Sequence, residues 1–136
     1  MNMLYMIDTD ICVYVAKQGY YPQVLARFNR LKFGDVGMSI VSYGELRFGA
    51  QKSQRPNEAL RNLSKFLEAV PVLEMDSGAA EHYGRLRFDL QRQGRPIGSN
   101  DLWIASHCLQ LGLTLVTNNE REFNRVPDLA IENWTL

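Results

Sequence analysis

Acidic side chains recur at four separate places in this chain, each beside an apolar run or at the start of a helical pattern. Asp8 follows the apolar run YMI, Glu45 lies in VSYGEL, Asp101 lies in IGSND, and Glu122 lies in TNNERE. Carboxylates brought close together repel one another unless a cation holds them, and oxygen ligands of this kind suit Mg²⁺ or Mn²⁺. The sequence therefore indicates a divalent metal site if the fold brings the four places together.

Each acid also has a purely structural interpretation. Ser42-x-x-Glu45 has the pattern of a helix capping box, Asp101 suits the positive end of a helix dipole, and Asp10 suits a helix cap. The sequence DTD also resembles the first motif of aspartate-nucleophile phosphatases of the haloacid dehalogenase type. That type needs a lysine late in the chain, and the second half of this sequence has none, so we discard the phosphatase interpretation.

Apolar runs alternate with amphipathic helical patterns, which predicts an α/β fold built on a parallel sheet. We expect strands at 3–7, ending near 40, at 70–76, 113–117 and 129–134, and helices at 11–17, 22–31, 43–49, 57–67, 77–93, 101–111 and 120–124. In such sheets ligands bind where the carboxyl ends of the strands lead into helices, which is where the acids fall. We find no internal repeat or long linker, so residues 1–136 are predicted to form a single domain.

The composition is that of an ordinary globular domain, with 46% hydrophobic residues, 22% charged residues and zero formal net charge. No apolar run reaches the roughly 18 residues of a membrane span, and no secretory signal is evident, so we expect a cytoplasmic protein without a membrane partner. Two isolated cysteines agree with a reducing compartment. Nine basic side chains fall within residues 42–96. These side chains belong either to a solvated helical surface or to a surface that binds phosphates.

Three long stretches resemble one known family. YMIDTDICVYVAK, SIVSYGELRFGAQKS and GRPIGSNDLWIASHCLQLGLTLVTNNEREFNRVPDLAIENW are similar, in order and spacing, to the PIN-domain ribonuclease toxins of the VapC group. The resemblance implies a PIN-like three-layer α/β fold, with a central, mostly parallel sheet of four to five strands flanked by helices. It also implies a metal-dependent endoribonuclease toxin, neutralised by a VapB antitoxin, that acts on RNA such as tRNA and forms homodimers.

Carried onto this chain, the resemblance makes Asp8, Glu45 and Asp101 the metal ligands, with Mg²⁺ as cofactor and Mn²⁺ able to substitute. Many PIN domains have a further aspartate where this chain has Asn119, and Glu122 could supply the missing charge. These five residues are the predicted catalytic set. The departure at Asn119 leaves an alternative open, in which the chain is a catalytically weak or inactive module that binds RNA or antitoxin.

Other residues acquire roles from this interpretation. Arg47, Lys52, Arg85, Arg87 and Arg92 could contact RNA phosphates, and Tyr43, Phe48 and Trp103 could stack on unpaired bases. His107, inside an apolar helical pattern, is expected to be packed or to face a partner. Met1, Met3 and Met6 are expected in the core of the first strand.

Overall fold

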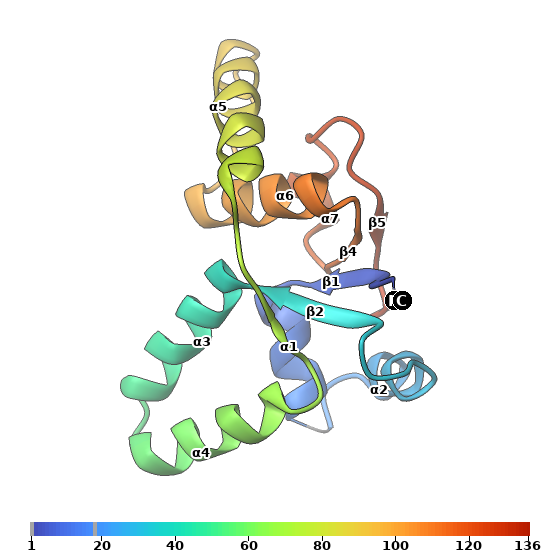
Figure 1. Cartoon of the computed structure of the whole chain (residues 1–136), viewed down its shortest axis with the longest axis vertical. Coiled ribbons are helices and arrows are strands. Elements are labelled where there is room, and N and C mark those ends of the chain that lie inside the picture. The colour runs from blue at the N-terminus through green and yellow to red at the C-terminus, as the bar shows by residue number, and fades with distance from the viewer. Residues whose placement is uncertain (1, 18) are drawn as a thin grey trace.

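The computed structural model describes residues 2–17 and 19–136, and this part of the chain forms five strands and seven helices (Figure 1). The strands are β1 (Tyr5–Ile7), β2 (Val36–Ser39), β3 (Val72–Leu73), β4 (Thr114–Val116) and β5 (Ile131–Glu132). The helices are α1 (Thr9–Ala16), α2 (Pro22–Asn29), α3 (Ile40–Gln51), α4 (Pro56–Leu67), α5 (Ser77–Arg92), α6 (Ser99–Leu111) and α7 (Glu120–Phe123). Met1, expected in the first strand, lies outside the described residues.

The strands form one sheet in the order β3-β2-β1-β4-β5, and every neighbouring pair is parallel. The predicted α/β class and parallel sheet of four to five strands are therefore confirmed. β1 lies at the centre, with Met6 paired to Gly37 of β2 and to Leu115 of β4. Because all strands point the same way, the helices α1 and α3 begin at the same edge of the sheet, directly after β1 and β2.

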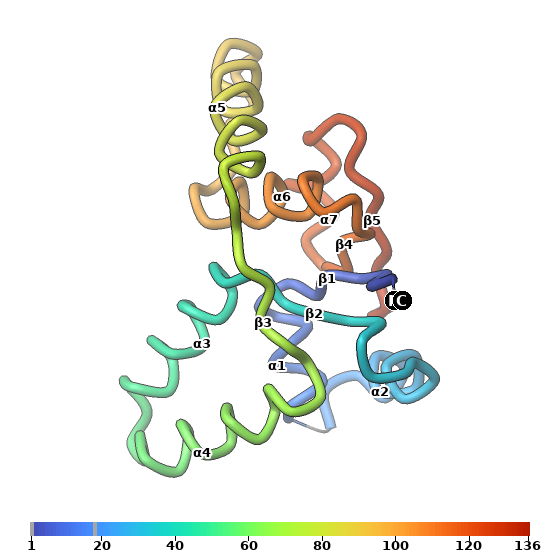
Figure 2. The backbone as a smooth tube through the Cα atoms, in the orientation of Figure 1, coloured from blue at the N-terminus to red at the C-terminus, as the bar shows by residue number. Residues whose placement is uncertain are grey.

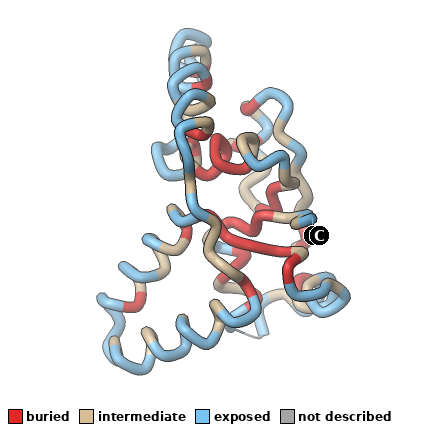
Figure 3. Tube along the Cα trace, in the orientation of Figure 1, coloured by how far each residue is buried: buried red, intermediate tan, exposed pale blue. Residues whose placement is uncertain are grey.

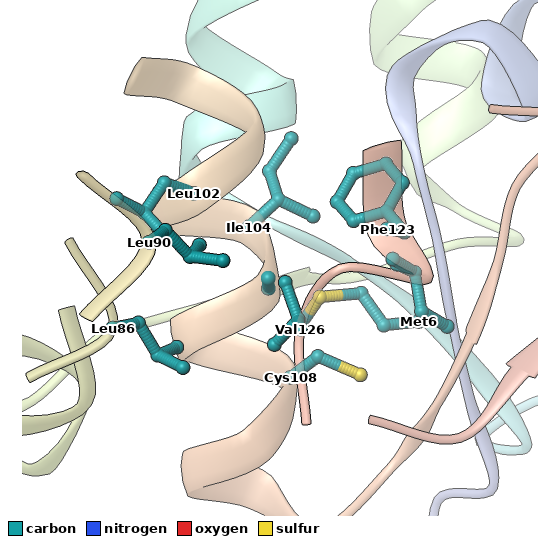
Figure 4. Close-up of a cluster of buried hydrophobic side chains, with 10 residues drawn as sticks. Met6, Leu86, Leu90, Leu102, Ile104, Cys108, Phe123 and Val126 are labelled. Atoms are coloured by element: carbon teal, nitrogen blue, oxygen red, sulfur yellow. The ribbon is translucent and has the colours of Figure 1, made fainter. Parts of the chain in front are cut away.

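Successive residues of β1 enter different cores, as the alternation of side chains along a strand requires. Met6 belongs to a cluster with Leu86 and Leu90 of α5, several α6 residues and the fully buried Phe123, shown in Figure 4. Ile7 belongs to a second cluster, formed with α1, α2 and neighbouring strands. The sheet is thus covered on both faces, which gives the expected three layers.

Two parts of the fold extend away from the sheet. Figures 1 and 2 show α3 and α4 projecting as a helical pair on one side and α5 projecting on the opposite side. Figure 3 shows that burial is concentrated in the sheet and α6, whereas α4 and most of α5 carry exposed or half-buried residues. Among the helices of residues 2–17 and 19–136, none has the length and apolar character of a membrane span.

The helix starts differ from two structural interpretations of the sequence. Asp8, rather than Asp10, caps α1, because its backbone is extended (φ −75°, ψ 175°) and its carboxylate accepts from the Ile11 amide. Ser39 caps α3 by accepting from the Val41 amide. The predicted Ser42–Glu45 capping box is therefore wrong, since α3 begins three residues earlier and both side chains contact Thr9 instead.

Candidate active site

Asp8 is fixed at the carboxyl end of β1 by donors from two other segments. Its Oδ1 accepts from the Ile11 amide at 3.2 Å, and its Oδ2 accepts from the Thr117 hydroxyl at the end of β4. Its own amide donates to the Val116 carbonyl, so the capping residue is joined to the neighbouring strand. Asp8 is only 6% exposed, which leaves its carboxylate little freedom to reorient.

Glu45 reaches the same edge from α3. The Thr9 hydroxyl donates to Glu45 Oε1 at 2.5 Å and lies 3.1 Å from the Ser42 hydroxyl. The other oxygen, Oε2, accepts from the Asn100 side chain at 3.3 Å. Glu45 therefore joins the second turn of α3 to the first turns of α1 and α6, and its carboxylate is held on both sides.

Asp101, Asn119 and Glu122 form the third part of the site. The Asn119 amide nitrogen donates to Glu122 Oε2 at 2.8 Å and lies 3.5 Å from Asp101 Oδ2. Glu122 Oε1 accepts from the Gly98 amide at the start of α6. The Asn119 backbone amide donates to the Thr117 hydroxyl, which itself donates to Asp8. Asn119 thus stands between two carboxylates as a neutral hydrogen-bond donor.

The acids influence one another electrostatically. Burial raises the pKa of Asp8 to about 6, with smaller contributions from the negative charges of Asp10 and Glu45, against the lowering effect of the Thr117 hydrogen bond. Burial, followed by the hydrogen bond and charge of Glu122, raises the pKa of Asp101 to about 7. The Asn119 hydrogen bond lowers the pKa of Glu122, which is the carboxylate of that pair that stays ionised.

These carboxylates fit a divalent cation by their chemistry. The donors are hard oxygen atoms, and two carboxyls with raised pKa lie where ionisation would be favoured by a nearby positive charge. Across residues 2–17 and 19–136, no three Asp, Glu, His or Cys side chains converge closely enough to enclose an ion as they stand. Their oxygens are instead engaged by hydroxyl and amide donors of Thr9, Thr117, Asn100 and Asn119.

The structure thus brings all five predicted site residues to one edge of the sheet, and it adds one that the sequence analysis missed. Asn100 precedes Asp101 in the stretch IGSND and was given no role of its own, although its side-chain amide contacts Glu45. No sequence signal marks it, because its partner lies 55 residues away. Its role follows only from the contact between α3 and α6.

His107 is buried beside this edge and has a structural role, as expected. Its Nε2 lies 2.9 Å from the Glu74 carbonyl oxygen, which can only accept, so Nε2 carries the proton. Its Nδ1 then accepts from the Ser39 hydroxyl at 2.8 Å. Burial lowers the pKa of His107, which agrees with a neutral ring whose two nitrogens are both satisfied.

Comparisons with known proteins identify relatives over almost the whole chain. The PIN domain family model matches residues 5–129. The chain is 44% identical over 131 residues to a tRNA(fMet)-specific endonuclease VapC from Shigella flexneri, covering 96% of this chain and 98% of the relative. It is 42% identical over 135 residues to Ribonuclease VapC1 from Haemophilus influenzae, covering 98% and 99%. Its fold matches the crystal structure of DNA-bound VapBC from Salmonella typhimurium with a TM-score of 0.89 and 37% identity, covering 97% of this chain and 98% of that one.

Proposed function

This chain belongs to the VapC family of PIN-domain ribonucleases, and we propose that it is a metal-dependent endoribonuclease, the toxin of a toxin–antitoxin module. The observation that carries the metal requirement is the meeting of Asp8, Glu45, Asp101 and Glu122 at one sheet edge, with the pKa of two of them raised. Helix capping accounts for single acids such as Asp8, but not for the gathering of four acids from separate segments at one edge. A group of carboxylates at one edge is what hydrolysis of a phosphodiester with a divalent cation requires.

Asp8 and Asp101 would hold the cation, with Glu45 completing the acidic set, and either Mg²⁺ or Mn²⁺ suits these oxygen donors. When bound, such a cation polarises the phosphodiester and favours ionisation of water. The missing fourth aspartate is the reason to expect fewer protein ligands on the Asn119 side of the site.

The protein's own side chains would position the reactants. Thr117 and the Ile11 amide fix the direction of the Asp8 carboxylate, so it need not reorganise during the reaction. Glu45, held by Thr9 and Asn100, would orient the attacking water and accept its proton. Asn119, which donates to Glu122 and lies beside Asp101, would orient these two carboxyl groups without adding charge.

An antitoxin has a suitable place to bind. A groove of ≈ 1230 Å³ runs between α1, α2, α3 and α4, and its lining combines apolar side chains such as Leu25, Leu46 and Phe66 with Thr9 and Glu45 of the site. The similar structures are VapBC complexes. We infer that a VapB-type antitoxin lies in this groove and places a basic side chain against the acids, because guanidinium groups pair well with carboxylates. Added Mg²⁺ should then compete with inhibition at constant ionic strength.

The RNA substrate is proposed from the relatives. One of them is named a tRNA(fMet)-specific endonuclease, so tRNA, and initiator tRNA in particular, is the first substrate to try. Action on tRNA would place the protein in the cytoplasm. A homodimer is expected from the family resemblance and can be tested by measuring the mass in solution.

The test uses antitoxin-free protein with total tRNA, in Mg²⁺ or in EDTA. Asp8→Asn removes the central carboxylate, and Asp10→Asn is a matched control because Asp10 is exposed in the first turn of α1. We expect the unmodified protein and Asp10→Asn to make a discrete cut, and to do so only with Mg²⁺. Asp8→Asn should make no cut. Folded protein that binds neither Mn²⁺ nor Mg²⁺ and cuts nothing would favour the inactive binding module, while cutting by Asp8→Asn in EDTA would refute this active site.

A further inference from the structure

His107 joins three segments of the chain that meet at the edge of the sheet where α3 begins. Its ring contacts Ser39, the last residue of β2, and the carbonyl of Glu74, which directly follows β3. Ser39 and His107 are both fully buried, so bulk water does not compete for the hydrogen bond between them. One side chain of α6 therefore holds the ends of two neighbouring strands.

The hydrogen bonds of this group run in one direction. Because Nε2 donates to the Glu74 carbonyl, Nδ1 carries no proton and accepts from the Ser39 hydroxyl at 2.8 Å. The Ser39 oxygen keeps its lone pairs for the Val41 amide, 3.1 Å away in the first turn of α3. A proton on Nδ1 would take away the acceptor of the Ser39 hydroxyl, and burial, which lowers the pKa of His107, opposes it. The neutral ring thus supports the cap of α3.

The two helices that this contact joins carry acids of the active site. Glu45 follows the Ser39 cap by six residues on α3. On α6, His107 follows Asp101 by six residues. α3 and α6 also meet at the rim of the site, where the Asn100 side chain donates to Glu45. The same pair of helices is therefore joined twice, once at the rim and once in the interior.

The inner contact is the firmer of the two. The Asn100 amide lies 3.3 Å from Glu45 Oε2, and Asn100 is exposed, so water competes for this hydrogen bond. The contact between Ser39 and His107 is shorter, at 2.8 Å, and it is fully buried, where a hydrogen bond is electrostatically stronger. The placement of α3 against α6, and with it that of Glu45 against Asp101, therefore depends on the His107 ring.

We propose that His107 is a positioning residue for phosphodiester cleavage. Its unprotonated Nδ1 holds the Ser39 hydroxyl, and through the start of α3 it sets Glu45 against Asp101. This inference rests on the proposed ribonuclease function and adds to it a buried residue that touches neither the RNA nor the cation. Loss of the contact lets α3 shift against α6, so Glu45 meets the attacking water in a poorer geometry. Turnover should then fall while binding of tRNA changes little.

Two substitutions each keep one half of the His107 network. In His107→Asn the amide oxygen lies near the place of Nδ1 and can accept from Ser39. In His107→Gln the amide nitrogen reaches the place of Nε2 and can donate to Glu74. We expect His107→Gln to lower kcat for tRNA cleavage about 10- to 100-fold, with KM within about twofold of the unmodified protein. His107→Asn should keep kcat within about threefold, although its smaller side chain leaves a cavity and makes it the less stable variant in urea unfolding.

A double-mutant cycle tests the pairing of His107 with Ser39 without the smaller Asn side chain. Ser39→Ala should lower kcat by at least as much as His107→Gln, because it also removes the cap of α3. Adding His107→Gln to Ser39→Ala should then change kcat by less than about twofold, since the contact is already absent. Effects on kcat that simply multiply would overturn the proposal.

The chain offers two matched controls. Ser106 is also fully buried, but its hydroxyl donates within α6, to the Leu102 carbonyl at 2.7 Å. His82 lies half-buried on α5, where its ring contacts Arg85. Ser106→Ala and His82→Gln should both leave kcat unchanged.

Nitrogen NMR of the two histidine rings gives a measurement that does not depend on cleavage. His107 Nδ1 should be unprotonated at neutral pH, and Ser39→Ala should shift its resonance while the resonances of His82 stay in place. A proton on His107 Nδ1 would overturn the proposal.

The outcomes separate this inference from the proposed function. An unmodified protein that cuts no tRNA defeats the proposed function itself, whatever the state of the His107 ring. A protein that cuts tRNA overturns the positioning role alone if His107→Gln is as active as His82→Gln, or if it is no less active than His107→Asn.

Discussion

The buried carboxyl of Asp8 should make the metal-free protein less stable as the pH rises. Its pKa is raised from 3.8 to about 6, so the folded protein holds this proton more tightly than the unfolded chain does. The free energy of unfolding must therefore fall as the pH rises from about 4 through 6. A difference of about two pKa units corresponds to about 3 kcal/mol at full ionisation, of which about 2 kcal/mol is lost between about pH 4.5 and pH 8.

Asp8→Asn removes this ionisation and keeps the shape of the side chain. The variant loses the charge-assisted hydrogen bond that the Asp8 carboxylate accepts from the Thr117 hydroxyl. This loss lowers the free energy of unfolding by about 1 kcal/mol or somewhat more at any pH. We expect the metal-free variant to be about 1–2 kcal/mol more stable than the unmodified protein near pH 8 and no more stable near pH 4.5. Removal of a residue proposed to be essential for activity would then stabilise the fold, as happens where function requires an unfavourable arrangement of charge.

The assay is urea unfolding in EDTA at the two pH values, with Asp10→Asn as the control. Addition of Mg²⁺ at the higher pH should stabilise the unmodified protein and the control, and leave Asp8→Asn unchanged. An equal loss of stability for Asp8→Asn at both pH values would refute the reasoning, because it would show that Asp8 is held as a carboxylate without electrostatic cost.

Three further predictions concern the site and the core. Thr9→Val removes the hydroxyl that donates to Glu45 Oε1, so it should lower kcat for tRNA cleavage about 10- to 100-fold with little change in the free energy of unfolding. Thr9→Ser keeps the hydroxyl and should retain most of the cleavage activity. Asn119→Asp replaces a neutral donor by a carboxylate beside Asp101, so Mn²⁺ should bind about tenfold more tightly by calorimetry, and unchanged affinity would show that Asn119 lies outside the metal's reach. Phe123→Ala empties a fully buried position and should cost about 3–5 kcal/mol in urea unfolding, whereas a loss below about 1 kcal/mol would contradict the packing described for α7.

The family resemblance and the alternation of apolar patterns were sufficient to predict the architecture. Strands such as 113–117 and helices such as 77–93 are recognisable because burial on a sheet or a helix face imposes a local period on the sequence. The observed β4 and α5 fall within these predictions, although β3 is much shorter than the predicted 70–76. Strand ends are set by pairing with neighbours, and β3 pairs with β2 only through Val72 and Leu73.

The sequence by itself also indicated that Asp8, Glu45 and the residues after Thr117 would meet, because strand ends in a parallel sheet share one edge whatever the details of the loops. Asp101 follows no strand, and the family resemblance added it to the set. Only the tertiary structure decided what each acid contacts there. The choice of Asp8 over Asp10 as the cap, the Thr9–Glu45 hydrogen bond across 36 residues and the contact between Asn100 and Glu45 across 55 residues follow from backbone angles and helix placement. Those depend on the packing of three helices against one sheet edge, for which a linear sequence carries no periodic signal.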